Sequence, residues 1–210
     1  MKKPRPVLAA MTVIGGLLLF AGFVHFPWPS RIMAVVGLLL AGGGIGFASR
    51  DQPLLHALGL TRPGRRVMYW TILAFSLGAL LAILTRNRFG ISLLPRTIGI
   101  MILVSPCIGA MEELVFRGYI QGRLRPSGRA LSILATALAH TGYKLLVILT
   151  LPGPGRFDPL FLGMWTFVGG TAFGITRDFS ENTIPPLIAH VVFDILLYGG
   201  LSTAPAWVWS

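Results

Sequence analysis

Long apolar runs occupy most of this chain, and they restrict it to folds that exist inside a membrane. A helix of about 20 apolar residues crosses the hydrocarbon core of a bilayer, and only helices and closed barrels satisfy their backbone hydrogen bonds there. The runs are Val7–Phe26, Ile32–Ser49, Val67–Thr85, Thr97–Phe116, Leu131–Leu151, Leu160–Thr176 and Thr183–Leu201. We therefore predict an all-α, polytopic transmembrane helix bundle with about seven spans. The range is six to eight, because the short segment Leu54–Leu60 and the C-terminal tail each leave the count open by one.

Composition supports a membrane domain and argues against a nucleic-acid partner. The 210 residues are 54% hydrophobic and only 12% charged, about half of the roughly 25% charged residues that a soluble domain carries. The net charge of +11 is of the kind that nucleic-acid-binding proteins show. Here, however, the basic residues lie mainly between the apolar runs, where membrane topology places them. We expect the lipid bilayer as the surroundings and no nucleic acid as a partner.

The distribution of basic residues predicts the orientation of the chain. Of the 18 Lys and Arg, twelve fall on the side of the N-terminus, five fall on the other side, and Lys144 lies inside a predicted span. Cytoplasmic loops carry the excess of Lys and Arg in membrane proteins. The chain is therefore predicted to be an integral membrane protein with a cytoplasmic N-terminus and an outer Trp207–Trp209 tail. In a prokaryote its location would be the plasma (inner) membrane.

A few ionisable side chains lie within the predicted spans and are candidates for function. They are Glu112, Glu113, His140, Lys144, His190 and Asp194. Such groups are costly in a bilayer, and they commonly mark functional sites. At 1.5 Å per residue, His140 and His190 lie roughly 16 and 10 Å from the cytoplasmic ends of their helices. Together with Glu112, which is expected near the cytoplasmic end of its own helix, they are predicted to share one hydrated cavity in that half of the bilayer.

Helical spacing assigns different roles to these side chains. Glu113 and Arg117 are four residues apart and are predicted to form an ion pair, while Glu112 is turned about 100° away and faces another helix. Lys144 is expected to snorkel or to neutralise a carboxylate. A carboxylate beside a neutral imidazole removes a proton from water as it attacks a peptide carbonyl, and further donors stabilise the oxyanion. The set therefore indicates hydrolysis.

These residues resemble three motifs of the CPBP family of intramembrane proteases, the CAAX proteases and bacteriocin-processing enzymes also called Abi proteins. Glu112-Glu113-Leu114-Val115-Phe116-Arg117-Gly118 matches EExxxR, His140 matches the histidine of FxxxH with Thr136 in place of Phe, and His190-Val191-Val192-Phe193-Asp194 matches HxxxN or HxxxD. The resemblance covers about residues 94 to 200. It divides the chain into N-terminal transmembrane helices, residues 1–93, and a CPBP/Abi-like catalytic bundle, residues 94–210, formed by the last four spans.

The resemblance implies a role for each matched residue. Glu112 and His140 would activate water, His190 and Asp194 would form the oxyanion site, and Glu113 and Arg117 would support them. Where the family has Asn, Asp194 donates a hydrogen bond only if it is protonated; otherwise it orients His190. The family is of the glutamate type, so no cofactor is expected. Zinc is a minority possibility, with Glu112, His140, His190 and Asp194 as its ligands.

The sequence supports two hypotheses for the function of this protein, and it argues against a third. The first is an intramembrane endopeptidase that cuts a membrane-associated protein or peptide near the cytoplasmic face. The second is a non-catalytic immunity or scaffold protein of the same fold, a reading favoured by Thr136 and Asp194. A proton-coupled transporter is less expected, since no inverted repeat is evident. Prenylated CAAX tails, bacteriocin leaders and C-terminal sorting helices would all suit the predicted site as substrates.

Overall fold

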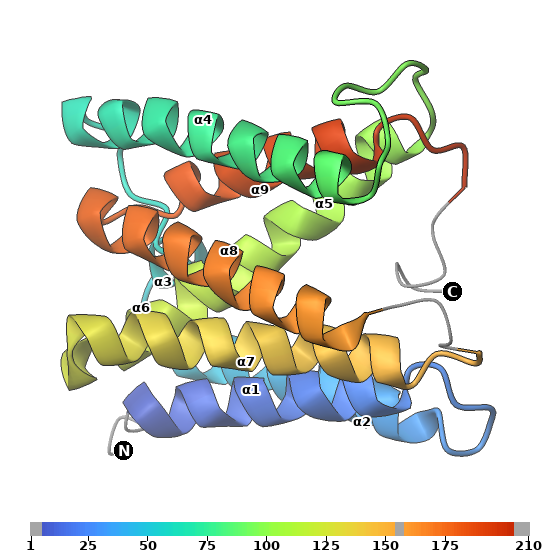
Figure 1. Cartoon of the computed structure of the whole chain (residues 1–210). Coiled ribbons are helices and arrows are strands. Elements are labelled where there is room, and N and C mark those ends of the chain that lie inside the picture. Colours follow the sequence, from blue (N-terminus) through green and yellow to red (C-terminus); the bar gives the residue numbers. More distant parts are fainter. Residues whose placement is uncertain (1–5, 154–157, 204–210) are drawn as a thin grey trace.

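The computed structural model describes residues 6–153 and 158–203, and the regular structure within these residues is helical throughout (Figure 1). The elements are α1 Pro6–Phe23, α2 Ile32–Ser49, α3 Leu54–Ala57, α4 Arg65–Arg88, α5 Met101–Glu113, the π-helix η1 Leu114–Ile120, α6 Gln121–Leu124, the 3₁₀ turn η2 Arg125–Ser127, α7 Arg129–Leu149, α8 Pro159–Ser180 and α9 Ile184–Tyr198. The predicted outer tail Trp207–Trp209 and the N-terminal basic residues Lys2, Lys3 and Arg5 lie outside the described residues.

The long helices correspond to the apolar runs of the sequence. Five of them, α1, α2, α4, α7 and α8, are long and apolar enough to cross a membrane, and α9 is a shorter apolar helix. The α5 helix continues without a break through η1 into α6, so Met101–Leu124 forms one further rod. The prediction of an all-α polytopic bundle is therefore confirmed among the described residues.

The helices form two groups that α5, η1 and α6 connect. In Figure 1 the helices α4 and α9 lie together on one side, α7, α1 and α2 lie on the other, and the α5–α6 rod runs obliquely between them. The first half of this rod packs on α9, while its second half packs on α1 and α7. The rod therefore carries any side chain near its middle into the space between the two groups.

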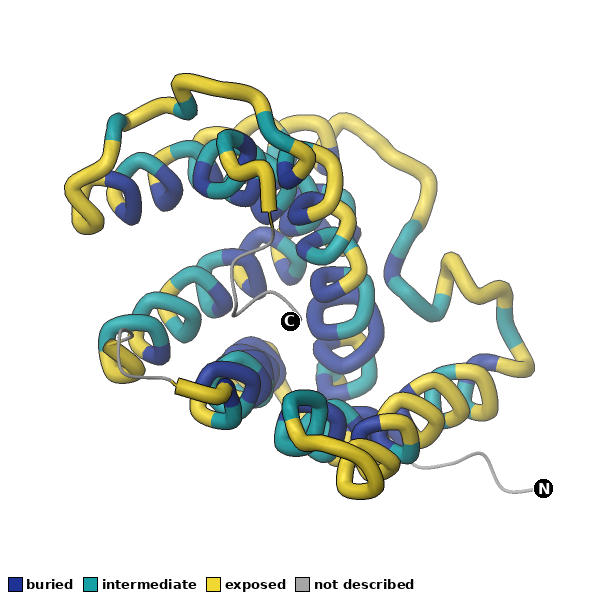
Figure 2. The backbone as a smooth tube through the Cα atoms, turned by 90° about the vertical axis from the view of Figure 1, so that its right-hand side faces the viewer, coloured by how far each residue is buried: buried dark blue, intermediate teal, exposed yellow. Residues whose placement is uncertain are grey.

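Close helix crossings rely on small residues. A Cβ atom on Gly16 of α1 would lie 2.6 Å from the carbonyl oxygen of Gly37 in α2, and one on Gly78 of α4 would meet the backbone of Ala189 in α9. Small residues let helix backbones approach closely where apolar burial cannot drive association. The outward faces carry large exposed side chains such as Leu39, as expected for surfaces that contact lipid. In Figure 2 many of the exposed positions lie along the outer sides of the helices.

The two ends of the bundle differ in charge. We call one the arginine-rich end. It is formed by the connections 50–64, 125–128 and 181–183 together with the helix ends beside them, and its arginines are Arg50, Arg62, Arg65, Arg66, Arg123, Arg125, Arg129 and Arg177. Several are tied down there; Arg125, for example, lies 2.7 Å from the buried carboxylate of Asp178. The opposite end holds residues 24–31, 89–100 and 199–203. We call it the cavity end, because a cavity inside the bundle is lined at this end by Phe89 and Tyr198.

Arg117 lies inside the bundle, although the predicted span Thr97–Phe116 ends one residue before it. The helix does not stop at Phe116 but continues as the π-helix η1, and Arg117 has no exposed surface. For the same reason Glu112 lies near the middle of the rod Met101–Leu124, whereas it was expected near the cytoplasmic end of a shorter span. The sequence does not predict this extension, because the residues after Phe116 include several polar residues and glycines, a composition that is typical of a loop.

Arg86 joins three segments at the cavity end. Its guanidinium donates hydrogen bonds to the carbonyl oxygens of Ser92 and Leu94 in the α4–α5 connection and of Leu196 and Leu197 in α9, over 2.5 to 3.3 Å. The last carbonyls of a helix have no partner within the helix. Arg86 therefore caps α9 and holds the connection against it.

We expect the Arg86→Met variant to be less stable by roughly 2–4 kcal/mol, because several carbonyls lose a charged donor at a buried position. Thermal unfolding of the purified protein in detergent measures this change. Arg88→Met is the matched control, since Arg88 is an exposed arginine one half-turn away that rests on the Phe161 ring. An equal loss of stability in both variants would contradict the role given to Arg86.

Candidate active site

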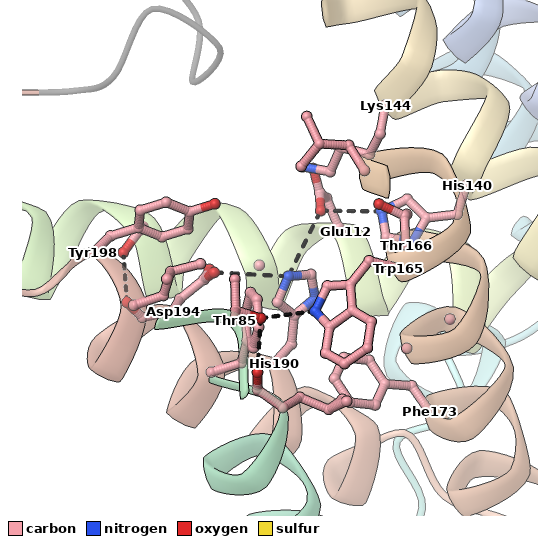
Figure 3. Close-up of a pocket in the computed structure, with 18 of the residues that line it drawn as sticks. Thr85, Glu112, His140, Lys144, Trp165, Thr166, Phe173, His190, Asp194 and Tyr198 are labelled. Atoms are coloured by element: carbon pink, nitrogen blue, oxygen red, sulfur yellow. Dashed lines mark hydrogen bonds and ion pairs between the residues drawn. The ribbon is translucent and has the colours of Figure 1, made fainter. Parts of the chain in front are cut away.

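The structure brings all six predicted site residues together between the two groups of helices, and Figure 3 shows four of them, Glu112, His140, His190 and Asp194. They are Glu112 and Glu113 from α5, Arg117 from η1, His140 from α7, and His190 and Asp194 from α9. All six are buried. The site lies near the middle of the α5–α6 rod because only there does the rod face α7 and α9 at once.

Glu112 lies at the centre of the cluster. Its Oε2 atom is 3.2 Å from Nε2 of His140 and 4.0 Å from Nε2 of His190. Its Oε1 atom lies 2.5 Å from the Nζ atom of Lys144, which follows His140 by one helical turn. Two helices other than its own thus provide partners for this carboxylate, as the convergence argument from sequence predicted.

Arg117 links the glutamate pair to His140. Its Nη1 atom donates to Oε1 of Glu113 over 3.0 Å and to Nδ1 of His140 over 2.9 Å. A guanidinium has donors and no acceptor, so Nδ1 of His140 must accept. The ring is therefore neutral, and its proton sits on Nε2, from which it donates to Glu112.

Glu113 performs the corresponding task for His190. Its Oε1 atom lies 2.8 Å from Nδ1 of His190. An ionised carboxylate only accepts hydrogen bonds, so His190 donates from Nδ1 and turns Nε2 toward the interior of the site. Asp194 lies 3.9 Å from that Nε2 atom, beyond hydrogen-bond distance. The ring of His190 is thus oriented by Glu113, although the sequence analysis considered Asp194 for this task.

Aromatic rings and a π-helix hold the site in place. The Phe116 ring packs on His140 with centroids 4.4 Å apart, and Phe173 lies 5.6 Å from His190 by the same measure. The π-helix η1 begins immediately after Glu113 and contains Arg117. Single π turns within α-helices often occur at functional sites, and here the wider turn carries Arg117 into the cluster.

A cavity of about 430 Å³ lies against the cluster. The ionisable side chains of its lining at the site are those of Glu112, Arg117, His140, Lys144, His190 and Asp194, and its other walls are mainly apolar and aromatic. Besides the site residues, the side chains that line it include Leu81, Thr85, Val147, Phe161, Leu162, Trp165, Thr166, Phe173, Phe193 and Leu197. Trp165 is held by a hydrogen bond from its indole nitrogen to Thr85 over 2.7 Å. Binding sites for small molecules and peptides commonly combine apolar walls with a few converging polar groups.

The sequence matches a known family across this site. The family is described as type II CAAX prenyl endopeptidase Rce1-like, and the match extends over residues 92–196, half of the chain. It includes every residue of the cluster around Glu112. The chain belongs to the Rce1-like family. No curated protein and no solved structure matches the chain.

Membership of the Rce1-like family confirms the resemblance that the motifs suggested. It places this protein among peptide hydrolases of the CAAX protease class that are embedded in membranes, with a protein or peptide as substrate. The match begins in the connection between α4 and α5 and ends within α9. The division of the chain at residues 93 and 94 stays a prediction, since α4 packs along α9 and α1 along α7.

The donor set of this Rce1-like site is poorly arranged for a metal ion. Within residues 6–153 and 158–203 no three His, Cys, Asp or Glu side chains are placed to hold one. Lys144 already contacts Oε1 of Glu112, and Arg117 already donates to Nδ1 of His140, so each of these two side chains has one donor atom taken by a cation. Zinc needs deprotonated donors that converge at about 2 Å. The cluster does not fit that requirement as it stands.

Gly109 makes room for the site, which the motifs alone do not reveal. A Cβ atom on Gly109 would lie 2.6 Å from Oδ2 of Asp194 and 2.9 Å from Cδ2 of His190. We expect the Gly109→Ala variant to displace His190 and to lower the cleavage rate by about 10²-fold, because errors of roughly 1 Å in a catalytic arrangement cost that much. The rate of cleavage in detergent or liposomes is the measurement.

Gly169→Ala is the matched control for Gly109→Ala. Gly169 also lines the cavity, but a Cβ atom there would meet Leu81 at an ordinary distance of 3.8 Å. Its cleavage rate should stay within about twofold of the wild type, since a contact of that length costs little. Equal rates for both glycine variants would show that the space beside Gly109 has no part in catalysis.

Proposed function

We propose that this protein is an intramembrane endopeptidase that hydrolyses a peptide bond in a membrane-associated protein or peptide. One observation carries the proposal: the buried Glu112 carboxylate lies between imidazoles of two other helices at the floor of an apolar cavity. Family membership supports peptidase chemistry in general. The roles of individual residues, given next, follow from the geometry of the hydrogen bonds.

In the first step Glu112 acts as the general base. A water molecule beside its carboxylate loses a proton to Oε, and the resulting hydroxide attacks the carbonyl carbon of the scissile peptide bond. His140 donates from Nε2 to Oε2 of Glu112 and so fixes the orientation of the carboxylate. Lys144 favours its ionised form through the contact at Oε1. The proposed pair for water activation is therefore Glu112 with His140.

His190 faces the oxyanion that this attack creates, and the ionised Asp194 lies 3.9 Å from its Nε2 atom and balances its charge. To donate from Nε2, His190 must carry a proton on both ring nitrogens, because Nδ1 already donates to Glu113. That charge has a balance in the site: Glu112, Glu113 and Asp194 face Arg117 and Lys144, so a proton on His190 makes the set neutral. A donor aimed at the developing oxyanion stabilises the transition state.

The reaction ends when the proton held by Glu112 passes to the leaving nitrogen. The carbon–nitrogen bond then breaks, the amine departs with that proton, and the new carboxyl group keeps the oxygen of the water. Glu112 is thereby returned to its ionised form. Every proton transfer in this proposed scheme is made by a side chain, so the scheme predicts a glutamate protease that works without a metal.

We expect the purified enzyme to retain at least about half of its cleavage rate after treatment with EDTA or 1,10-phenanthroline, because all of its catalytic groups are side chains. The measurement compares chelator-treated protein with untreated protein at equal concentration in the same detergent. Loss of activity that added Zn²⁺ restores would instead support the four-ligand zinc site considered from sequence.

The function itself is tested by looking for new peptide termini. Membranes that contain the wild-type protein are compared with membranes that contain the Glu112→Gln variant at the same level, and protein N- and C-termini are identified by mass spectrometry. Termini that appear only with the wild type identify both the substrate and the bond that is cut. If the two membranes give the same termini, and a prenylated CAAX peptide also remains uncut, the proposal fails.

A non-catalytic membrane immunity or scaffold protein remains the alternative. One feature favours it: both oxygens of Glu112 have partners, His140 at Oε2 and Lys144 at Oε1. A carboxylate engaged in this way has a structural reason to be buried. The comparison of wild type with Glu112→Gln separates the readings, because a scaffold would keep its cellular effect in the variant.

A further inference from the structure

The cavity above Glu112 extends toward one end of the bundle. Its lining residues come from the C-terminal parts of α4, α7 and α9, from residues 105–112 in the first half of the α5–α6 rod, and from α8 as far as Phe173. These parts all lead from the site to the end that carries residues 89–100 and 199–203. Arg88, Phe89, Asp158 and Tyr198 line the cavity at that end. Figure 2 views the bundle from this side.

Toward the arginine-rich end the site is closed by packed side chains. Arg117 itself has no exposed surface, and a Cβ atom on Gly170 of α8 would lie 2.8 Å from its Nη2 atom. Beyond it, Gln121 donates to the carbonyl oxygen of Gly174 over 2.9 Å and is also buried. The packing of η1 against α7 and α8 thus separates Glu112 from the arginine-rich end.

The charges of the two ends indicate which side of the membrane each end faces. Among the described residues, eight arginines lie at the arginine-rich end and four at the cavity end: Arg31, Arg86, Arg88 and Arg96. Arg86 is one of the four, and its guanidinium is buried against backbone carbonyls. Loops rich in Lys and Arg stay on the cytoplasmic side. The arginine-rich end is therefore assigned to the cytoplasm and the cavity end to the opposite side.

We propose that the substrate reaches Glu112 from the non-cytoplasmic side, as an extended apolar segment of a membrane-associated or exported protein. This rests on the proposed peptidase function, and it replaces the expectation that cleavage occurs near the cytoplasmic face. From His140 to the last residue of α7, Leu149, the helix rises roughly 14 Å at 1.5 Å per residue, so the segment reaches about half-way into the bilayer before it meets the site.

The chemistry of the outer cavity fits such a segment. Phe161 lies between Phe89 and Trp165 with ring centroids 6.0 Å from each, and Arg88 stacks over the Phe161 ring at 5.2 Å. Aromatic walls bind apolar side chains, while Arg88 and Asp158 near the opening suit the polar backbone or a charged end of the peptide. A lipid-modified tail anchored in the cytoplasmic leaflet would instead meet the packed side of the site.

Single cysteines test the direction of access without any need for activity. Cys107 is the only cysteine of the chain, so a Cys107→Ser background gives a clean start. In it, Phe89→Cys reports on the opening, Thr166→Cys on the cavity wall, and Ser127→Cys, at an exposed site of the arginine-rich end, serves as the control. Intact cells are treated with a membrane-impermeant maleimide or methanethiosulfonate reagent, and the same reaction is repeated after permeabilisation.

We expect Phe89→Cys and Thr166→Cys to react in intact cells, and Ser127→Cys to react at least tenfold faster once the membrane is permeabilised. Reaction of Ser127→Cys in intact cells while Thr166→Cys is protected would invert the orientation and overturn the proposal. So would protection of Thr166→Cys under both conditions, because the cavity would then be closed. Since labelling does not depend on cleavage, a failed peptidase assay leaves this result interpretable, and the reverse also holds.

Discussion

The Glu112→Gln variant is expected to fold and insert normally but to lose cleavage by roughly 10²–10⁴-fold, the usual contribution of a general base. The amide keeps the size of the side chain and an oxygen that accepts from His140 or Lys144, so the helices around it need not move. What it loses is the ability to take a proton from water. The rate of cleavage of a substrate in liposomes, at equal amounts of inserted protein, measures the effect.

Glu181→Gln is the matched control for this experiment. Glu181 is an exposed carboxylate at the C-terminal end of α8, and it lies 3.4 Å from Arg66. It belongs to the arginine-rich end and does not line the cavity. Its removal should leave the rate within about twofold of the wild type, since surface ion pairs contribute little. A Glu112→Gln protein that cuts as fast as the Glu181→Gln protein would show that Glu112 is not the base.

The Arg117→Met variant should suffer in stability as well as in activity. It leaves the fully buried carboxylate of Glu113 without its cation and removes the donor that sets the proton on His140. Removing one partner of a buried ion pair costs roughly 3–5 kcal/mol. Thermal unfolding in detergent is expected to occur at a clearly lower temperature, and cleavage should be lost even below that temperature.

Two further variants separate the charge of Arg117 from its geometry. Arg117→Lys restores a cation near Glu113 but cannot reach Glu113 and His140 with one planar group, so stability should partly return while cleavage does not. Arg129→Met is the control, because Arg129 is an exposed arginine 3.4 Å from Asp178 at the arginine-rich end. If Arg117→Met unfolds at the same temperature as Arg129→Met, the central position given to this residue is wrong.

The fold could be predicted from sequence because the bilayer leaves few alternatives. Apolar runs of the right length must become helices there, and the predicted runs agree with the observed helices to within a few residues, as for Ile32–Ser49 and α2. The exception is the extension of α5 through η1. A π turn has no clear sequence signature, so the chain after Phe116 was taken for a loop, and Arg117 was placed on the wrong side of that boundary.

The members of the site were predictable, but their partners were not. Spacing and motifs indicated that Glu112, His140 and His190 would meet, and the structure places Nε2 of His140 at 3.2 Å and Nε2 of His190 at 4.0 Å from Oε2 of Glu112. The contact of Lys144 with Glu112 was one of two options left by its position in α7. That Glu113 rather than Asp194 bonds to His190 depends on the rotation of α9 against α5, which no spacing within a single helix determines.

The hydrogen bonds of Arg117 also have a consequence for how this site can change over evolution. One guanidinium fixes the proton on His140 directly and, through Glu113, the proton on His190. The protonation states of the two imidazoles are therefore thermodynamically coupled. His140 and His190 belong to different helices, and they are connected through Arg117 and Glu113. Substitutions at Arg117 and at either histidine should not be additive in their effects. Residues joined in this way are expected to be retained or lost as a unit.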